Sequence, residues 1–151
     1  MPISQSITTS FKTDLLSGGM NFNTTNRALS ANTQDVFVIA LYTSSASIGP
    51  ATTAYTATDE VPNGSGYVTL GKTLTISQVP TSTGTTAYLD FDDVSWTSAS
   101  FSADGALIYN STNANKSVAV LNFGGTKTVT SGTFTIQFPT ADASNAIIRI
   151  A

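Results

Sequence analysis

The sequence predicts an all-β protein, folded as an antiparallel β-sandwich or jelly roll of about eight strands with a polar N-terminal arm. Thr and Ser supply 26 and 19 of the 151 residues, and β-branched Thr favours strands that have one packed side and one solvent-facing side. Short apolar segments alternate with turn signals from residue 36 to the C-terminus, as in sandwiches and barrels. The length corresponds to one domain.

The first 35 residues differ in composition from the rest of the chain. Residues 1–35 are polar and weakly periodic and are predicted to form the N-terminal arm, whereas residues 36–151 are predicted to form the β-sandwich domain. Such an arm can either fold over the domain or reach a neighbouring subunit. Its apolar residues are the predicted interface anchors: Phe11, Leu15, Leu16 and Phe22.

The first two elements have clear local signals. A short helix is expected at 11–17, because Ser10 can cap its start and Gly18 or Gly19 can end it. "VFVIALY" at 36–42 is continuously apolar, which predicts a strand that is buried on both faces.

The later strands are predicted from alternation and turn residues. "GTFTIQF" alternates cleanly, with Phe134, Ile136 and Phe138 on its inner face. "STNAN" predicts a hairpin with a five-residue loop, and Gly71 predicts a bulge or bend. "FGGTKT" (123–128) lacks the spacing of a phosphate-binding loop and is predicted to be a turn between two strands. The expected later strands are 67–76, 87–91, 94–97, 105–110, 116–124, 132–138 and 146–150.

"LDFDDVSW" holds three of the nine acidic residues and the only Trp. Its apolar residues share one buried side only if the alternation slips by one residue at the "DD" pair, which predicts a bulge or turn there. We expect Asp90 and Asp92 on the solvent-facing side. The residues expected on the buried side are Leu89, Phe91, Val94 and Trp96.

Other chemical roles for these side chains remain open. Asp59 or Glu60 could face an acid of "DFDD" as a glycosidase pair, which requires one carboxyl with a raised pKa and a defined separation. Calcium prefers oxygen ligands, although "DFDD" lacks the D-x-[DN]-x-[DN]-G pattern of a calcium loop. Sugars could also stack on tyrosines, most of which fall inside strand patterns and are predicted as core or rim: Tyr42, Tyr55, Tyr67, Tyr88 and Tyr109.

Composition argues against several classes of protein. The net charge is −3 and the six basic residues are scattered, so no basic stripe is available to neutralise phosphates. The chain has no His and no Cys, which removes Ser-His-Asp triads, disulfides and thiolate metal sites. The longest apolar run has seven residues, too few to span a bilayer. We therefore predict no enzyme activity, no cofactor, no metal, and neither nucleic acid nor membrane as a partner.

Several long segments of the chain carry a resemblance to known proteins, among them "SFKTDLLSGGMNF", "TAYLDFDDVSWTSASFSADGALIYN" and "KSVAVLNFGGTKTVTSGTFTIQFPTADASNAIIRI". They resemble small β-rich structural proteins of tailed bacteriophages, most like capsid decoration (cement) proteins. The resemblance spans most of the chain and lies in whole segments, without a catalytic signature. It implies a jelly-roll or sandwich fold and a place on the capsid surface of the virion, with assembly in the host cytoplasm, and it carries over no functional residue.

The expected function is therefore that of a phage virion structural protein, a decoration or cement protein that binds and stabilises the outer surface of the head. Its expected partners are the major capsid protein and itself, as a dimer or trimer, because contact points on capsids are symmetric. The alternatives are a tail-associated structural protein and a receptor- or carbohydrate-binding protein.

Overall fold

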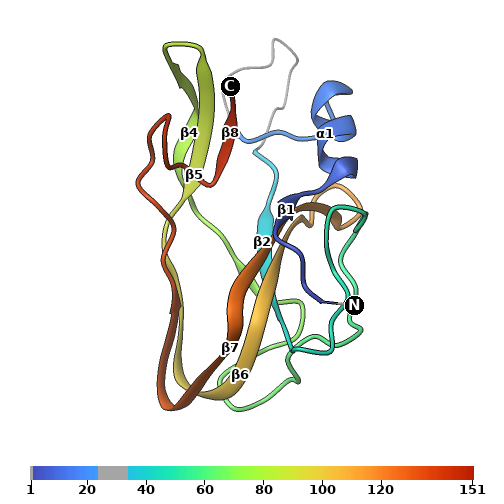
Figure 1. Cartoon of the computed structure of the whole chain (residues 1–151), viewed down its shortest axis with the longest axis vertical. Coiled ribbons are helices and arrows are strands. Elements are labelled where there is room, and N and C mark those ends of the chain that lie inside the picture. The colour runs from blue at the N-terminus through green and yellow to red at the C-terminus, as the bar shows by residue number, and fades with distance from the viewer. Residues whose placement is uncertain (1, 24–33) are drawn as a thin grey trace.

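The computed structural model describes residues 2–23 and 34–151. Within these residues the chain has eight strands, one short helix and two antiparallel sheets (Figure 1), which confirms the predicted all-β sandwich. The larger sheet has the strand order β1-β7-β6-β2-β3 and the smaller sheet the order β4-β5-β8. The elements are β1 (Ser6–Ile7), α1 (Thr9–Leu16), β2 (Phe37–Tyr42), β3 (Lys72–Thr73), β4 (Ile76–Thr83), β5 (Thr86–Phe91), β6 (Val94–Asn110), β7 (Lys116–Ile136) and β8 (Ile148–Ile150).

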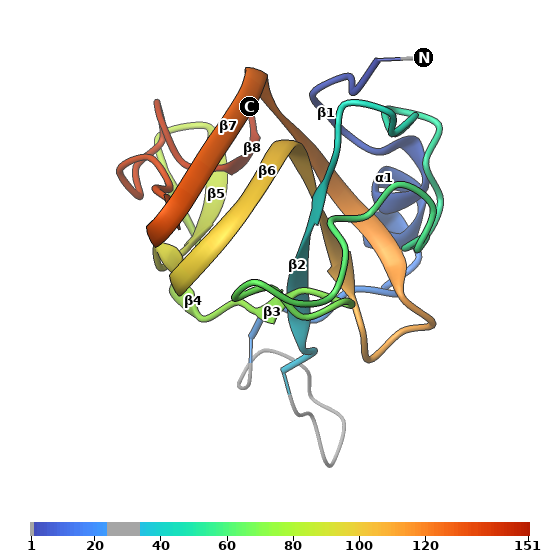
Figure 2. The same ribbon diagram turned by 90° about the horizontal axis from the view of Figure 1, so that it is seen from below.

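β6 and β7 form one long bent hairpin, where the sequence predicted four separate strands. The predicted loop at 111–115 joins them, and Figure 2 shows the hairpin as an inverted V whose two halves face each other. Phe123 and Phe134 lie eleven residues apart in β7, yet their ring centroids are 6.1 Å apart. A straight strand of that length would separate them by roughly 36 Å. The bend therefore lets one hairpin supply strands to both sides of the core.

The corner of this hairpin lies at "FGGTKT", predicted as a turn between two strands. The structure corrects that prediction, because the segment is a bulge inside β7. Asn122 pairs with Gly105 and Lys127 with Ala103, so β7 carries three more residues than β6 between the same two pairs. Gly124 and Gly125 have φ values of 70° and 122°, a backbone conformation that glycine adopts without strain.

The described part of the N-terminal arm folds over the domain. β1 pairs with β7, and Phe11, Met20 and Phe22 are buried in the main core cluster. Asp14 forms an ion pair of 2.6 Å with Lys116 at the start of β7. These residues therefore share one core with the domain, and the boundary predicted at residue 35 does not separate two packed units within the described chain.

α1 begins two residues earlier than predicted. Its N-cap is Thr8, not Ser10, and the Thr8 side chain accepts a hydrogen bond of 3.3 Å from the Phe11 amide. The helix ends at Leu16, one residue before the predicted end; Ser17 is the C-cap and Gly18, one of the two predicted terminators, has a φ of 75°.

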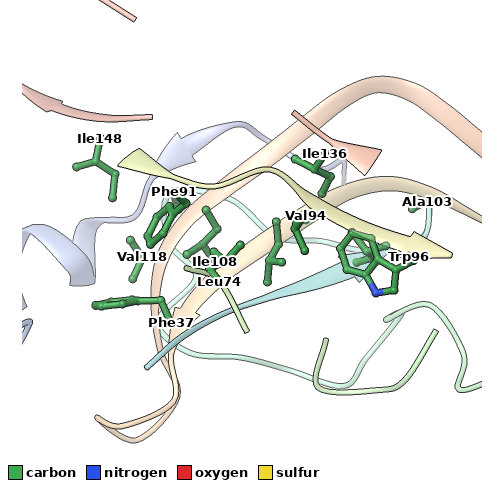
Figure 3. Packing of buried hydrophobic residues seen from close by; sticks show 14 of the residues in the cluster. Phe37, Leu74, Phe91, Val94, Trp96, Ala103, Ile108, Val118, Ile136 and Ile148 are labelled. Atoms are coloured by element: carbon green, nitrogen blue, oxygen red, sulfur yellow. The ribbon is translucent and has the colours of Figure 1, made fainter. Parts of the chain in front are cut away.

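The main core lies between the two halves of the bent hairpin and the smaller sheet (Figure 3). A second apolar cluster covers the other face of β2, with Val38, Ala40 and Tyr42 opposite the main core. The prediction of a strand buried on both faces is confirmed for residues 37–42, whereas Val36, the first residue of the predicted range, is 45% exposed. The labelled residues of the main core are Phe37, Leu74, Phe91, Val94, Trp96, Ala103, Ile108, Val118, Ile136 and Ile148.

The strand predicted at 67–76 is mostly wrong. Only β3 and the first residue of β4 fall within that range, and the preceding residues form a turn closed by the Gly64–Tyr67 bridge. Gly71 has a φ of 82°, and a Cβ placed on it would lie 2.0 Å from the Ile39 carbonyl oxygen. This contact explains the bend predicted at Gly71. β4 was not predicted, since its exposed "ISQVPTST" contains Pro80, which only an edge strand tolerates.

Candidate functional site

The structure confirms the buried side predicted for "LDFDDVSW". β5 ends at Phe91 and β6 begins at Val94, so the chain breaks its alternation at Asp92 and Asp93, as the pattern indicated. Asp92 is exposed, and Asp93 accepts a hydrogen bond of 2.8 Å from the Phe138 amide. The four residues on the buried side are at most 6% exposed: Leu89, Phe91, Val94 and Trp96.

The prediction for Asp90 is wrong, because its side chain is fully buried. Its carboxyl accepts hydrogen bonds from the Phe91 amide at 2.9 Å and from the Ile147 amide at 3.4 Å. The C-terminal segment before β8 therefore lies against this face of β5, which alternation alone would leave to solvent. Burial raises the pKa of the Asp90 carboxyl above its ordinary value, and the charges of Asp93 and Asp142 add to that effect.

Glu60 is also a buried carboxylate, and it is surrounded by donors. Tyr67 Oη donates to Oε1 at 2.6 Å, the Leu70 amide donates to the same oxygen at 2.9 Å, and Tyr55 Oη donates to Oε2 at 2.6 Å. Tyr67 Oη in turn accepts from the Leu41 amide at 2.9 Å. This Glu60–tyrosine cluster joins the 55–70 region to β2, an inner strand of the larger sheet, and donors of the chain itself occupy both carboxylate oxygens.

The tyrosines around Glu60 are held as donors. Burial and the hydrogen bond to Glu60 raise the pKa of Tyr67 above its ordinary value, and burial with the charge of Glu60 raises the pKa of Tyr109 to about 12. Tyr109 Oη donates to the Leu70 carbonyl at 2.6 Å, and Tyr42 Oη donates to the Thr56 carbonyl at 2.6 Å. These three rings are almost fully buried, so they belong to the core, as predicted.

The structure does not bring Asp59 or Glu60 together with Asp90 across a cleft, as a glycosidase pair would require. Glu60 is enclosed by its tyrosines, Asp90 lies under the C-terminal segment, and Asp59 is an exposed turn residue with a φ of 60°. No group of three or more acidic side chains that could hold a metal ion is found among residues 2–23 and 34–151. Both carboxylates therefore act as internal parts of the fold.

Most of the predicted interface residues lie away from the buried carboxylates, in an apolar groove between α1 and β8. Three of the four line it: Phe11 and Phe22 are buried on its floor, and Leu15 is half-buried at its wall. Leu16, the fourth, is 91% exposed at the end of α1. We call this feature the α1–β8 groove, and its lining residues are Phe11, Leu15, Phe22, Pro80, Ala87, Tyr88, Leu89, Ile148 and Ile150.

The lining of the groove is almost entirely apolar, and no charged side chain is part of it. Ile150, 54% exposed, continues its apolar surface to the end of β8. Figure 1 places α1 and β8 at the same end of the molecule. A groove with exposed apolar residues on its rim has the character of a contact surface for another molecule.

Comparison of the chain with known protein families, curated proteins and solved structures finds no match. The resemblance to phage structural proteins therefore stays a prediction. Among the described residues, no helix is both long enough and apolar enough to cross a membrane.

Proposed function

We propose that the chain is a structural protein of a tailed bacteriophage particle, which decorates the outer surface of the head and stabilises it without catalysis. The α1–β8 groove is the contact surface for the major capsid protein. The observation that carries the proposal is the convergence of Phe11, Leu15 and Phe22, predicted as interface residues from the sequence, on one apolar groove. The resemblance of the long segments to phage structural proteins supplies the virion context.

An exposed apolar side chain on the groove rim gives the physical basis. Ile150 lines the groove and is 54% exposed, and covering it with a partner removes apolar surface from water. A partner surface that exists only in the assembled shell stabilises that shell by mass action. The proposal includes a symmetric dimer or trimer of the chain at each contact point.

Add-back to purified heads tests this function. Heads prepared without the chain are incubated with the native chain and with an Ile150→Asp variant, and bound chain is measured by sedimentation. We expect the native chain to bind and the variant to lose about tenfold in affinity, because an exposed charge replaces a buried apolar contact. Val68→Asp is the matched control, since Val68 is 65% exposed and lies outside the groove. If the native chain neither binds nor stabilises heads but binds tails, head decoration is wrong and a tail-associated role takes its place.

A further inference from the structure

Within residues 2–23 and 34–151, one edge of the smaller sheet is unpaired. β8 is an outer strand in the order β4-β5-β8, and it pairs only with β5, through Leu89–Ile148, Tyr88–Arg149 and Ala87–Ile150. No other backbone hydrogen bond to β8 is formed by the described part of the chain. An outer strand presents alternate N–H and C=O groups that can pair with one more strand.

The two outer strands of this sheet differ in how well they can pair with a further strand. β4 carries Pro80, which lacks an amide hydrogen, and its pairing with β5 shifts register twice. Both features discourage further strand pairing. β8 has neither a proline nor a bulge, and its only charged residue, Arg149, donates to the Ala143 carbonyl at 3.3 Å. The edge that the described residues leave unpaired and unprotected is therefore that of β8, beside the α1–β8 groove.

The groove specifies what can cover this edge. Ile148 and Ile150 are two residues apart on one strand, so they lie on the same face, and both line the groove. α1 supplies Phe11 and Leu15 from the other side. A single extended segment would pair with β8 and place every second side chain against this apolar lining. The edge of a second folded copy would bring its neighbouring strands against α1, which favours a single segment.

We propose that β8 and the α1–β8 groove bind an extended segment of a partner protein, added as a fourth strand to the β4-β5-β8 sheet. The segment has apolar residues at alternate positions, as strand addition requires. Backbone pairing supplies affinity and the groove selects the side chains. The inference rests on the proposed docking role of the groove and names the chemistry of its partner.

A peptide pair tests the backbone part of this proposal. The probe is a short acetylated peptide of alternating Val and Thr with Lys at both ends, and its control has the same side chains with every backbone amide N-methylated. We expect the probe to bind and to slow amide hydrogen exchange in β8, measured by NMR. The N-methylated peptide should not bind, because methylation removes the backbone donors on both of its edges. Equal binding of the two peptides, or no binding of either, would overturn strand addition.

Side-chain variants test the groove. Ile150→Lys places a charge on the rim and should weaken probe binding about tenfold, through loss of one buried aliphatic side chain. Val79→Lys is the matched control, because Val79 is 43% exposed on β4 and does not line the groove. Equal weakening by both variants would contradict the proposed site.

Hydrogen exchange on the particle separates this inference from the proposed function. If the native chain binds heads but its β8 amides exchange as fast as in the free chain, strand addition is wrong and head decoration stands. If the probe peptide binds but heads do not bind the chain, the strand site stands and head decoration is wrong. A dimer with protected β8 amides in the absence of peptide would instead identify a second copy as the occupant and overturn the proposal.

Discussion

Glu60 and Asp90 are both buried carboxylates, but the chain supplies them with very different partners. Glu60 receives two tyrosine hydroxyls at 2.6 Å and the Leu70 amide at 2.9 Å. Asp90 receives the amide of its own neighbour at 2.9 Å and the Ile147 amide at 3.4 Å, with Asp93 and Asp142 as like charges nearby. Glu60 is well compensated for the loss of water, and Asp90 is not.

Burial of a carboxylate therefore has two different consequences in this chain. A buried carboxylate with short donors on both oxygens fixes the groups that donate to it. Glu60 does so for the turn before β3, where Leu70 adopts a φ of 76°, a strained value for a bulky residue. Asp90 holds only two backbone amides in place, so the main effect of its burial is to make the stability of the fold depend on pH.

The largest expected effect is that of Glu60→Ala. It leaves two tyrosine hydroxyls and the Leu70 amide without their acceptor, and we expect it to lower the free energy of unfolding by about 3 kcal/mol or more. Urea unfolding followed by Trp fluorescence measures the loss. Glu60→Gln keeps one acceptor oxygen and should lose about 1 kcal/mol. Equal stability of the Ala variant and the native chain would contradict the role of Glu60 in fixing the groups that donate to it.

The next largest effect is a difference between two tyrosines of the cluster in how much each contributes to the free energy of unfolding. Tyr67→Phe removes a donor to Glu60 and the acceptor of the buried Leu41 amide, and should lower the free energy of unfolding by about 2 kcal/mol. Tyr55→Phe removes one donor from a half-buried ring and should lower it by about 1 kcal/mol. The two variants are compared by the midpoint of urea unfolding. A larger loss for Tyr55→Phe would reverse this ranking.

A third effect concerns pH. Because the pKa of Asp90 is raised in the folded chain, its ionised form opposes folding, and this cost vanishes as pH falls below the ordinary carboxyl pKa of about 3.9. Asp90→Asn removes the charge at every pH. The Tm of the variant minus that of the native chain should therefore be larger at neutral pH than at about pH 4. A difference that grows on acidification would show that the bonds to Phe91 and Ile147 outweigh burial.

The smallest effect is that of the exposed neighbour. Asp92 lies outside the strands and is exposed, so Asp92→Asn should change the free energy of unfolding by less than about 0.5 kcal/mol at any pH. Thermal unfolding of this variant beside Asp90→Asn isolates the contribution of burial. A shift as large as that of Asp90→Asn would place the pH dependence in local charge and not in burial.

Much of the fold could be predicted because strand patterns are local. The continuous apolar run of β2, the alternation at Phe134, Ile136 and Phe138, and the slip at Asp92–Asp93 each follow from which side chains neighbour one another along the chain. The groove was anticipated only in part. Phe11, Leu15 and Phe22 stood out as apolar residues in a polar segment, whereas Tyr88, Ile148 and Ile150 carried no signal of meeting them.

The sequence by itself determined the all-β class, the apolar faces and the short helix, since these depend on propensity and period over a few residues. The tertiary structure alone decided that Asp90 is buried, that four predicted strands join into two, and that α1 lies beside β8. Alternation tells which side chains share a face. Whether that face meets water or another segment depends on contacts such as Asp90 with Ile147, which join residues far apart in the chain.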